Sequence, residues 1–275
     1  MARILAISSH VAHGHVGLSA IVPALHRLGH EVIALPTVLL SNHPRHAHCA
    51  GQPVAPAKLA EMLDALDGNG WLRETHAILT GYLPSVAHVR FAASAAARVS
   101  AYQPQAEFFC DPVMGDDPNG LYIDEDAALA IRDELAPLAD MLFPNRFELA
   151  WLSQLAVDDV SSAIEAAREL AARAVLATSI VAGPGRLANL LVVGGDAAQC
   201  MVEARSGVPH GTGDLLSALF VGHRLGGGRG STHLGAAVAG VEAAIEASHG
   251  CDDLRLIASM ERWANPIPLR VDHLG

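Results

Sequence analysis

Lysine is nearly missing from this chain of 275 residues, in which Lys58 is the only one. A GK[ST] phosphate-binding loop is therefore absent, and Schiff-base chemistry would depend on that single residue. Lysine and arginine together number 18 against 29 aspartates and glutamates, the formal net charge is -11, and no basic residues cluster into a local stripe. Nucleic acid is consequently not expected as a partner.

Cysteine is also scarce, and long apolar runs do not occur. The four cysteines are far apart, without a CxxC pair or the spacing of a disulfide framework, so we expect reduced thiols in a cytoplasmic protein. The apolar stretch at residues 4–7 is too short for a signal peptide, and no run of ~18 apolar residues follows. Neither secretion nor a membrane partner is therefore expected.

Apolar runs typical of strands alternate along the chain with segments of helical period, which predicts βαβ units. Strands are expected at residues 3–8, 31–35, 76–80, 106–110, 141–143 and 175–179, and helices at 18–28, 56–67, 85–101, 146–153, 161–172, 213–225 and 231–248. An antiparallel pair, residues 187–193 and 199–204, is expected to close one edge. Without a linker or repeat, residues 1–275 are expected to form a single α/β domain. Its doubly wound, mostly parallel central sheet would carry helices on both faces.

Two segments do not fit this regular pattern. Residues 41–57 carry three histidines and three prolines and fit no regular element, so we interpret them as a mobile flap near a ligand. Residues 226–230 are four glycines and one arginine, which predicts a flexible connector between the last two helices.

The most informative motif is the GTGD sequence at residues 211–214, directly before a predicted helix. Two glycines at a helix N-terminus can turn several backbone N–H groups toward one point, which favours anion binding. Asp214 lies in the first helical turn, where it could accept a proton from a substrate hydroxyl. This combination indicates phosphoryl transfer, although an isolated GxGD also fits a capping aspartate after a glycine turn.

Further acidic residues follow two neighbouring predicted strands. Asp111 and Asp116 come after the strand at 106–110, and Glu148 comes after the strand at 141–143. Because the carboxyl ends of parallel strands face the ligand crevice, we expect these side chains to converge near the GTGD turn. Mg²⁺ between the carboxylates and substrate phosphates would make such a cluster favourable. Any one of them taken alone also fits a solvated acid in a turn.

Several motifs together resemble the pyridoxal kinases of the ribokinase superfamily over about residues 3–250. The shared stretches are SSHV at 8–11 with GHVG at 14–17, SNH at 41–43, TGY at 80–82, DPVMG at 111–115, PN at 144–145 followed by Glu148, and GTGD at 211–214. GTGD and DPVMG also occur in hydroxymethylpyrimidine kinases, whereas the other stretches are more particular to pyridoxal kinases. The resemblance implies a ribokinase-like fold and ATP-dependent phosphorylation of the 5′-hydroxyl of pyridoxal in vitamin B6 salvage. Pyridoxine and pyridoxamine are further expected acceptors.

The same resemblance implies residue roles. Asp214 corresponds to the base that activates the 5′-hydroxyl, and the anion hole corresponds to Gly211, Thr212 and Gly213. The positions associated with ATP, with Mg²⁺ or another divalent cation and with a monovalent cation such as K⁺ are matched by Asp111, Asp116 and Glu148. The nucleotide side is matched by Asn145, Thr178 and Thr212, and the vitamin pocket by Ser9, Val16, His43 and Tyr82. A homodimer is implied as well.

Three residues depart from the family pattern. Pro44 stands where members usually carry a threonine that binds the substrate, and proline offers neither a hydroxyl nor an N–H. Phe143 replaces a small or hydroxylated residue before the Pro-Asn pair, and Thr178 stands where bacterial relatives often have lysine. One phosphate countercharge would then be missing, and Arg186 or Arg45 are the candidates to replace it.

Alternative interpretations stay open at this point. Two histidine groups, at positions 10, 13 and 15 and at positions 43, 46 and 48, raise the idea of a transition-metal site, but no HExxH or paired Cys/His spacing occurs. A hydroxymethylpyrimidine kinase would keep the fold with another acceptor. A catalytically weak B6-binding or regulatory homologue would fit the three departures. A dehydrogenase is disfavoured because no GxGxxG follows the first strand.

Overall fold

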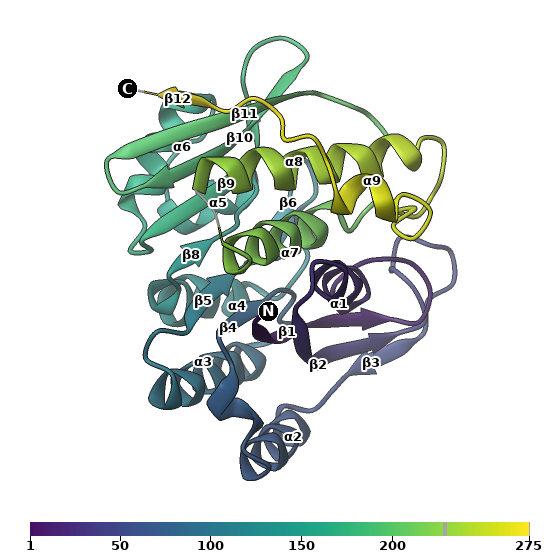
Figure 1. The fold of residues 1–275 in the computed structure, drawn as a ribbon, viewed down its shortest axis with the longest axis vertical. Helices are drawn as coiled ribbons and strands as arrows, with labels where there is room; N and C mark the ends of the chain where they lie inside the picture. The colour runs from purple at the N-terminus through teal and green to yellow at the C-terminus, as the bar shows by residue number, and fades with distance from the viewer. Residues whose placement is uncertain (228–229, 275) are drawn as a thin grey trace.

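A ten-stranded sheet forms the centre of the computed structural model, which describes residues 1–227 and 230–274, the side chains of residues 230 and 231 excepted. The strands lie in the order β12-β11-β10-β9-β8-β5-β4-β1-β2-β3 (Figure 1). Their bounds are β1 Arg3–Val11, β2 Glu31–Leu40, β3 Gly51–Pro53, β4 Ala77–Thr80, β5 Glu107–Cys110, β8 Met141–Leu142, β9 Ala174–Val181, β10 Arg186–Val193, β11 Asp196–Glu203 and β12 Asp272–Leu274. A separate two-stranded ribbon joins β6, Gly115–Asp116, to β7, Gly120–Leu121.

The six strands from β9 to β2 in this order pair in parallel, and the α/β fold class predicted from the sequence is confirmed. Side chains of a strand alternate between the two faces of its sheet. In β1, Ile4 and Ala6 enter one hydrophobic core, while Leu5 and Ile7 enter the other. A strand buried on both faces needs this unbroken apolar run, which is why the sequence signal at residues 4–7 is strong.

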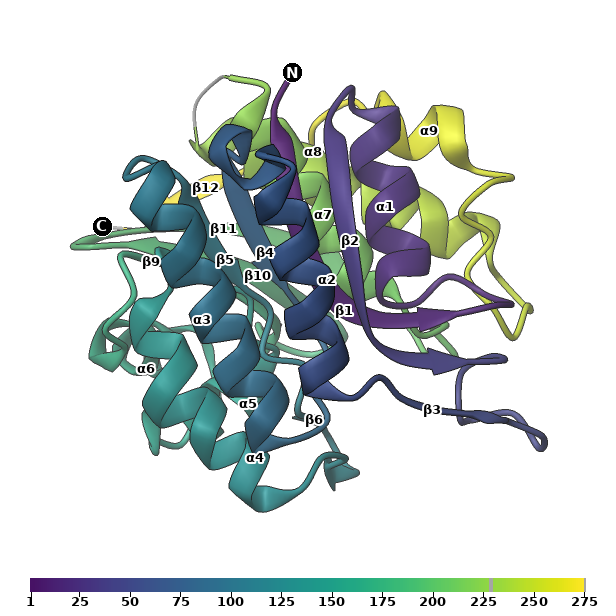
Figure 2. The same cartoon turned by 90° about the horizontal axis from the view of Figure 1, so that it is seen from below.

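Helices cover both faces of the sheet (Figures 1 and 2). One core is covered by α2 Pro56–Gly68, α3 Val86–Tyr102, α4 Glu125–Ala130, α5 Arg146–Ser153 and α6 Val160–Glu169, and the other by α1 Leu18–Arg27, α7 Thr212–Leu225, α8 Gly230–Ala247 and α9 Met260–Ala264. Three single-turn elements complete the described helices, η1 Trp71–Glu74, η2 Ile131–Leu135 and η3 Ala136–Leu138. The predicted helix at 146–153 begins and ends at the observed residues. Each of the other predicted helices begins or ends within one to three residues of the observed helix.

Two sequence-based expectations about the sheet edges were wrong. Residues 41–57 are not irregular throughout, because Gly51–Pro53 form β3 and pair antiparallel with β2. The antiparallel pair β10–β11 exists as predicted but does not close the edge, since β12 pairs with β11 beyond it. Strands of three residues are too short to show a period of two, so the sequence carried no signal for either. The predicted connector at 226–230 includes residues 228 and 229, which lie outside the described residues.

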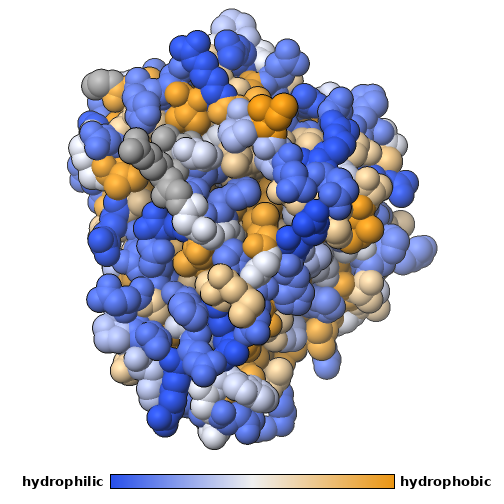
Figure 3. Space-filling model, in the orientation of Figure 1, coloured by the Kyte–Doolittle hydropathy of each residue, from blue (hydrophilic) through white to orange (hydrophobic). Residues whose placement is uncertain are grey.

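The surface is mixed in character. On the face shown in Figure 3, hydrophobic residues lie in small groups scattered among hydrophilic ones. Over the part of the chain that is described, no helix combines the length and apolar character needed to cross a bilayer.

A buried histidine, His30, links the N-terminal residues to α7 by hydrogen bonds. The His30 side chain is 4% exposed; its Nδ1 accepts a hydrogen bond from the Ala2 N–H at 3.2 Å, and its Nε2 donates to the Gly222 carbonyl at 2.9 Å. Burial lowers the pKa of His30, and the contact with Gly222 opposes this only in part. His30 is therefore a neutral hydrogen-bonding link within the fold.

We predict that this link makes folding sensitive to acid. Below pH 6.5 the unfolded chain protonates this histidine more readily than the folded protein does, so stability falls as pH falls through this range. His30→Gln keeps one donor and one acceptor without titrating. Urea unfolding at pH 7.5 and 5.5 should show a smaller acid-induced loss of stability in this variant than in the wild type. The exposed His249→Gln serves as the control and should keep the wild-type loss; equal losses in all three proteins would contradict the prediction.

Candidate active site

The carboxyl ends of four neighbouring parallel strands bring the candidate residues to one edge of the sheet. Ser9 lies near the end of β1, Tyr82 follows β4, Asp111 follows β5 directly, and Asn145 follows β8. The pairing of β1 with β4, β4 with β5 and β5 with β8 is parallel throughout, so these ends share a direction. This is the edge at which open α/β sheets bind ligands.

Asp111 is the innermost acid of the group. It is 7% exposed, and its carboxylate is stabilised by the Val113 backbone N–H and the Ser217 hydroxyl. Even so, the pKa of Asp111 is raised well above its usual range, first by burial and then by the charges of Glu148 and Asp214. Val113 adopts φ 35°, a left-handed conformation that is rare for a β-branched residue and marks strained backbone beside the acid.

Glu148 combines structural and electrostatic roles. Its buried carboxylate accepts hydrogen bonds from the N–H groups of Met114 at 2.8 Å, Gly115 at 3.4 Å and Asn145 at 2.9 Å. The last of these forms a capping box for α5, because the Asn145 Oδ1 accepts in return from the Glu148 N–H at 3.0 Å. Burial outweighs these three donors and raises the pKa of Glu148 to about 7.

Asp214 lies in the first turn of α7, after the glycine turn predicted from the sequence. Gly211 has φ 97°, and a Cβ built on it would overlap the carbonyl oxygen of His15. Glycine is therefore required where α7 meets the loop between β1 and α1. From that loop the Gly17 N–H donates to the Asp214 carboxylate, yet burial is the larger effect and raises its pKa to about 6.

The β6–β7 ribbon brings a fourth acid and a tyrosine to the group. Asp116 accepts a hydrogen bond from Asn119 at 2.8 Å, and its charge raises the pKa of Glu148. Tyr122 follows the ribbon, and although the residue as a whole is about half exposed, its phenol group is partly desolvated. Its pKa is raised by burial and then by Glu148, Asp111, Asp214 and Asp116, so the phenol shares the surroundings of all four carboxylates. No sequence argument identified Tyr122, because the two-residue strands before it show no pattern.

In the structure that is described, no basic side chain forms an ion pair with Asp111, Glu148 or Asp214. Among the described residues, the arginines and Lys58 that form ion pairs do so elsewhere, and the interactions that shift Asp111, Glu148 and Asp214 come from other carboxylates, backbone N–H groups and a hydroxyl. Buried like charges without a cationic partner are unfavourable. The carboxylates beside the glycine turn therefore fit a bound divalent cation, to which they would supply hard oxygen ligands.

In residues 1–227 and 230–274, no group of three or more histidine, cysteine, aspartate or glutamate side chains is arranged to hold a metal ion by itself. The histidine groups at 10, 13 and 15 and at 43, 46 and 48 do not form such a group either.

His43 lies on the loop between β2 and β3 and stacks on His210, with ring centroids 4.1 Å apart and 18° between the planes. Burial is the main reason that its pKa falls to about 4, with the charges of His210 and Arg45 as further causes. The ring is therefore neutral at pH 7. Its Nδ1 accepts from the Arg45 N–H at 3.2 Å, so the proton resides on Nε2 and is free for donation.

The remaining predicted pocket residues pack around the loop between β1 and α1. A Cβ on Gly17 would overlap the Ser9 carbonyl, so Ser9 lies directly against this loop, and Val16 lies against Gly211. The Tyr82 N–H donates to the Ser8 hydroxyl at 3.1 Å, and burial raises the pKa of its phenol. The structure thus brings Ser9, Val16 and Asp214 together around one loop.

On the other side of Asp111, the predicted nucleotide residues are tied to the backbone. The Asn145 Nδ2 donates to the Gly115 carbonyl at 2.7 Å, and the Thr178 N–H donates to the Pro144 carbonyl at 2.9 Å. Phe143 points into the core, where its ring packs 6.2 Å from Phe109 and 5.7 Å from Phe220 between centroids. The bulk of Phe143 is therefore a core feature.

The two candidate phosphate arginines lie in different places. Arg45 is close enough to His210, which precedes the glycine turn, to lower the pKa of that histidine, although burial is the larger cause. Arg186 begins β10, where its backbone pairs with Glu203, and it is not among the groups that shift the pKa of any described site residue. Arg45 is the better placed of the two.

Comparisons with known proteins agree with this geometry. The family model for phosphomethylpyrimidine kinase matches residues 17–255. The pyridoxal kinase PdxY of Leifsonia xyli is 35% identical over 272 residues, which covers 96% of each chain. The chain belongs to the pyridoxal kinase family. Another family member, PdxY of Deinococcus radiodurans, is 34% identical over 278 residues, 96% of this chain and 93% of its own.

Solved pyridoxal kinases share the whole fold. The pyridoxal kinase of Leishmania donovani in complex with ADP and pyridoxamine covers 100% of both chains with a TM-score of 0.94 and 31% identity. The pyridoxal kinase of Entamoeba histolytica has the same TM-score at 23% identity, which shows the fold alone. The family resemblance drawn from the sequence motifs is therefore confirmed, whereas the roles of individual residues stay predictions.

The two glycines of the GTGD turn give a matched test of its geometry. Gly211→Ala should lower the free energy of unfolding by about 1–3 kcal/mol or more, because the backbone at Gly211 is in the left-handed region and an added Cβ would overlap the His15 carbonyl oxygen. Gly213→Ala should be neutral or slightly stabilising, because that position is helical and has nothing within 4 Å of an added Cβ. Urea unfolding of both variants measures the difference, and equal stabilities would show that the turn relaxes.

Proposed function

We propose that this member of the pyridoxal kinase family transfers the γ-phosphate of ATP to the 5′-hydroxyl of pyridoxal, with pyridoxine and pyridoxamine as further acceptors. The observation that carries the proposal is the position of Asp214 at the glycine turn, beside the buried acids Asp111 and Glu148. The relatives named pyridoxal kinase over 96% of the chain support the acceptor class. Support for the nucleotide comes from the Leishmania enzyme, which was solved with ADP and pyridoxamine.

Asp214 would act as the general base. Its pKa of about 6 leaves it mostly ionised at pH 7 and still able to take up a proton. As the acceptor oxygen attacks the γ-phosphorus, its proton passes to Asp214, the bond from phosphorus to the β-phosphate oxygen breaks, and ADP leaves. Backbone N–H groups at Gly211, Thr212 and Gly213 would stabilise charge on the transferred phosphoryl group.

The acidic side chains would hold the cations of the reaction. Asp111, Asp116 and Glu148 provide oxygen ligands for Mg²⁺ or another divalent cation, with K⁺ as a candidate monovalent ion. When bound, Mg²⁺ neutralises charge on the phosphates. Asn145 and Thr178 would line the nucleotide side, and Ser9, Val16, His43 and Tyr82 the vitamin side, where the Nε2–H of His43 can donate to an acceptor atom of the ring substituents.

We further propose that residues 1–275 work as one kinase domain in the cytoplasm and form a homodimer, as the family resemblance implies. A single sheet that takes strands from Arg3–Val11 at one end of the chain and Asp272–Leu274 at the other supports the single domain.

The acceptor is tested by a panel assay. Purified protein with MgATP is given pyridoxal, pyridoxine, pyridoxamine or hydroxymethylpyrimidine, and ADP release and phosphorylated product are both measured. We expect pyridoxal to be phosphorylated and to outcompete hydroxymethylpyrimidine. Turnover of hydroxymethylpyrimidine alone would reassign the acceptor. Binding of pyridoxal without any turnover would instead favour a B6-binding homologue.

The base is tested by Asp214→Asn, which keeps the shape of the side chain but cannot accept the proton at neutral pH. Turnover should fall by about 10²–10⁴-fold, the usual contribution of a general base, while the KM for MgATP changes little. A melting temperature that does not fall serves as the control for folding. Near-normal turnover would remove Asp214 from this role.

A further inference from the structure

The loop of residues 41–50 is an ordered unit with a closed base. The Ser41 N–H donates to the Ala50 carbonyl at 2.7 Å, and the Ala50 N–H donates to the Ser41 hydroxyl at 3.0 Å. Inside it, the Asn42 Nδ2 donates to the carbonyls of His43 at 3.1 Å and His48 at 2.9 Å. Because these hydrogen bonds hold its backbone together, the 41–50 loop can move or stay in place as one unit, and a few side-chain contacts are enough to fix its position.

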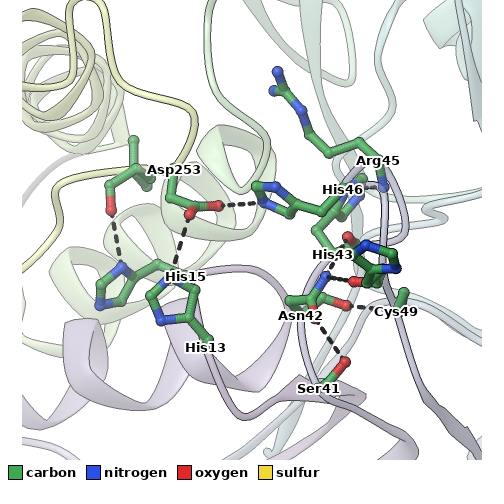
Figure 4. Close-up of polar contacts among 11 residues, drawn as sticks. His13, His15, Ser41, Asn42, His43, Arg45, His46, Cys49 and Asp253 are labelled. Atoms are coloured by element: carbon green, nitrogen blue, oxygen red, sulfur yellow. Dashed lines mark hydrogen bonds and ion pairs between the residues drawn. The ribbon is translucent and has the colours of Figure 1, made fainter.

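One such contact reaches a distant segment. The His46 Nε2 lies 3.1 Å from the Asp253 Oδ1, and the other oxygen of Asp253 lies 3.5 Å from the His13 Nε2 (Figure 4). Asp253 follows α8, whereas His13 belongs to the loop between β1 and α1. That loop is also held to the Asp253 segment by the His15 Nδ1–H, which donates to the Leu254 carbonyl at 2.8 Å. Three segments far apart in sequence therefore meet at Asp253.

The two side-chain contacts of Asp253 differ in how exposed they are to solvent. The side chains of His46 and Asp253 are 28% and 30% exposed, whereas that of His13 is 80% exposed. Water screens exposed pairs strongly, so the pair with His46 is the stronger of the two. Burial alone would raise the pKa of Asp253, but the hydrogen bond from His46 and the charges of His46, His13 and Arg45 lower it.

The other end of the loop contacts the predicted active site. His43, three residues before His46, stacks on His210, and His210 directly precedes the Gly211 turn. Any movement of the 41–50 loop away from Asp253 would therefore carry His43 away from the acceptor side of the site.

We propose that Asp253 is a positioning residue, which anchors the 41–50 loop through His46 and thereby holds His43 at the acceptor side. The part that concerns the acceptor rests on the proposed function, whereas the anchoring itself does not. Nothing in the family resemblance assigned a role to the segment after α8.

Trypsin tests the anchor without any assumption about activity. Arg45 is exposed in the loop, and cleavage of the bond between Arg45 and His46 requires the loop to leave its site. Asp253→Ala should accelerate this cleavage by about two- to fivefold, the range expected for losing a partly exposed ion pair. Asp252→Ala, which removes a neighbouring exposed acid without a described partner, is the matched control and should cleave at the wild-type rate.

A second comparison shows whether the effect passes through His46. In the His46→Ala background, adding Asp253→Ala should leave the cleavage rate unchanged, because the contact is already gone. An equal acceleration in both backgrounds, or none in either, would overturn the anchor. Unchanged melting temperatures would exclude general loosening.

Steady-state kinetics test the positioning of the acceptor side. In Asp253→Ala the KM for pyridoxal should rise by about two- to fivefold, while kcat and the KM for MgATP stay within twofold of the wild type. Faster cleavage with an unchanged KM for pyridoxal would overturn the positioning role and leave only the anchor. Faster cleavage in a protein that does not phosphorylate pyridoxal at all would refute the proposed function and not the anchor.

Discussion

The burial of three carboxylates, Asp111, Glu148 and Asp214, at one edge of the sheet is the constraint on which the rest of the site depends. Burial is the main reason that their pKa values are raised, and for Asp111 the charges of Glu148 and Asp214 add to the effect. In the described structure their charge is met by backbone N–H groups and a hydroxyl, not by lysine or arginine. Such a site is unfavourable when left alone and favourable with a cation and a phosphate, which is the state that a phosphoryl transfer enzyme must stabilise.

Backbone geometry makes this arrangement sustainable. Glu148 accepts hydrogen bonds from three N–H groups, and the one from Asn145 also belongs to the capping box of α5. One contact therefore both stabilises the buried carboxylate and caps the helix. The donors for Asp111 and Asp214 lie at Val113 and Gly17, both with positive φ. A strained residue, Val113, and a left-handed glycine, Gly17, therefore supply the amides that stabilise these two acids, which pre-organises the site.

Features that depend on neighbouring residues in the chain could be predicted from the sequence, whereas features that depend on residues far apart could not. The long strands and helices could be predicted because a buried face of eight or more residues shows its period, and Asp111 and Glu148 could be predicted to converge because both follow parallel strands. Tyr122 and the strands β3 and β12 could not, since segments of two or three residues carry no period and these, unlike β8, lie outside the alternation of strands and helices that marks the parallel sheet. The contact of His46 with Asp253 spans 207 positions and depends on side-chain placement, for which a single sequence has no signal.

The same distinction separates the two sides of the site. The residues proposed for the nucleotide side follow strand ends and a helix cap, whereas several of those proposed for the acceptor side lie on loops, one of which carries the contacts of His43 with His210 and of His46 with Asp253. Pro44 lies between the stack of His43 on His210 and the contact of His46 with Asp253. Proline fixes its own φ and so reduces the number of conformations that a loop can adopt. Because the 41–50 loop is also held by contacts on both sides of Pro44, ordering it when a ligand binds costs little conformational entropy. At this position the chain lacks the hydroxyl and the N–H that another residue could offer and gains a stiffer loop.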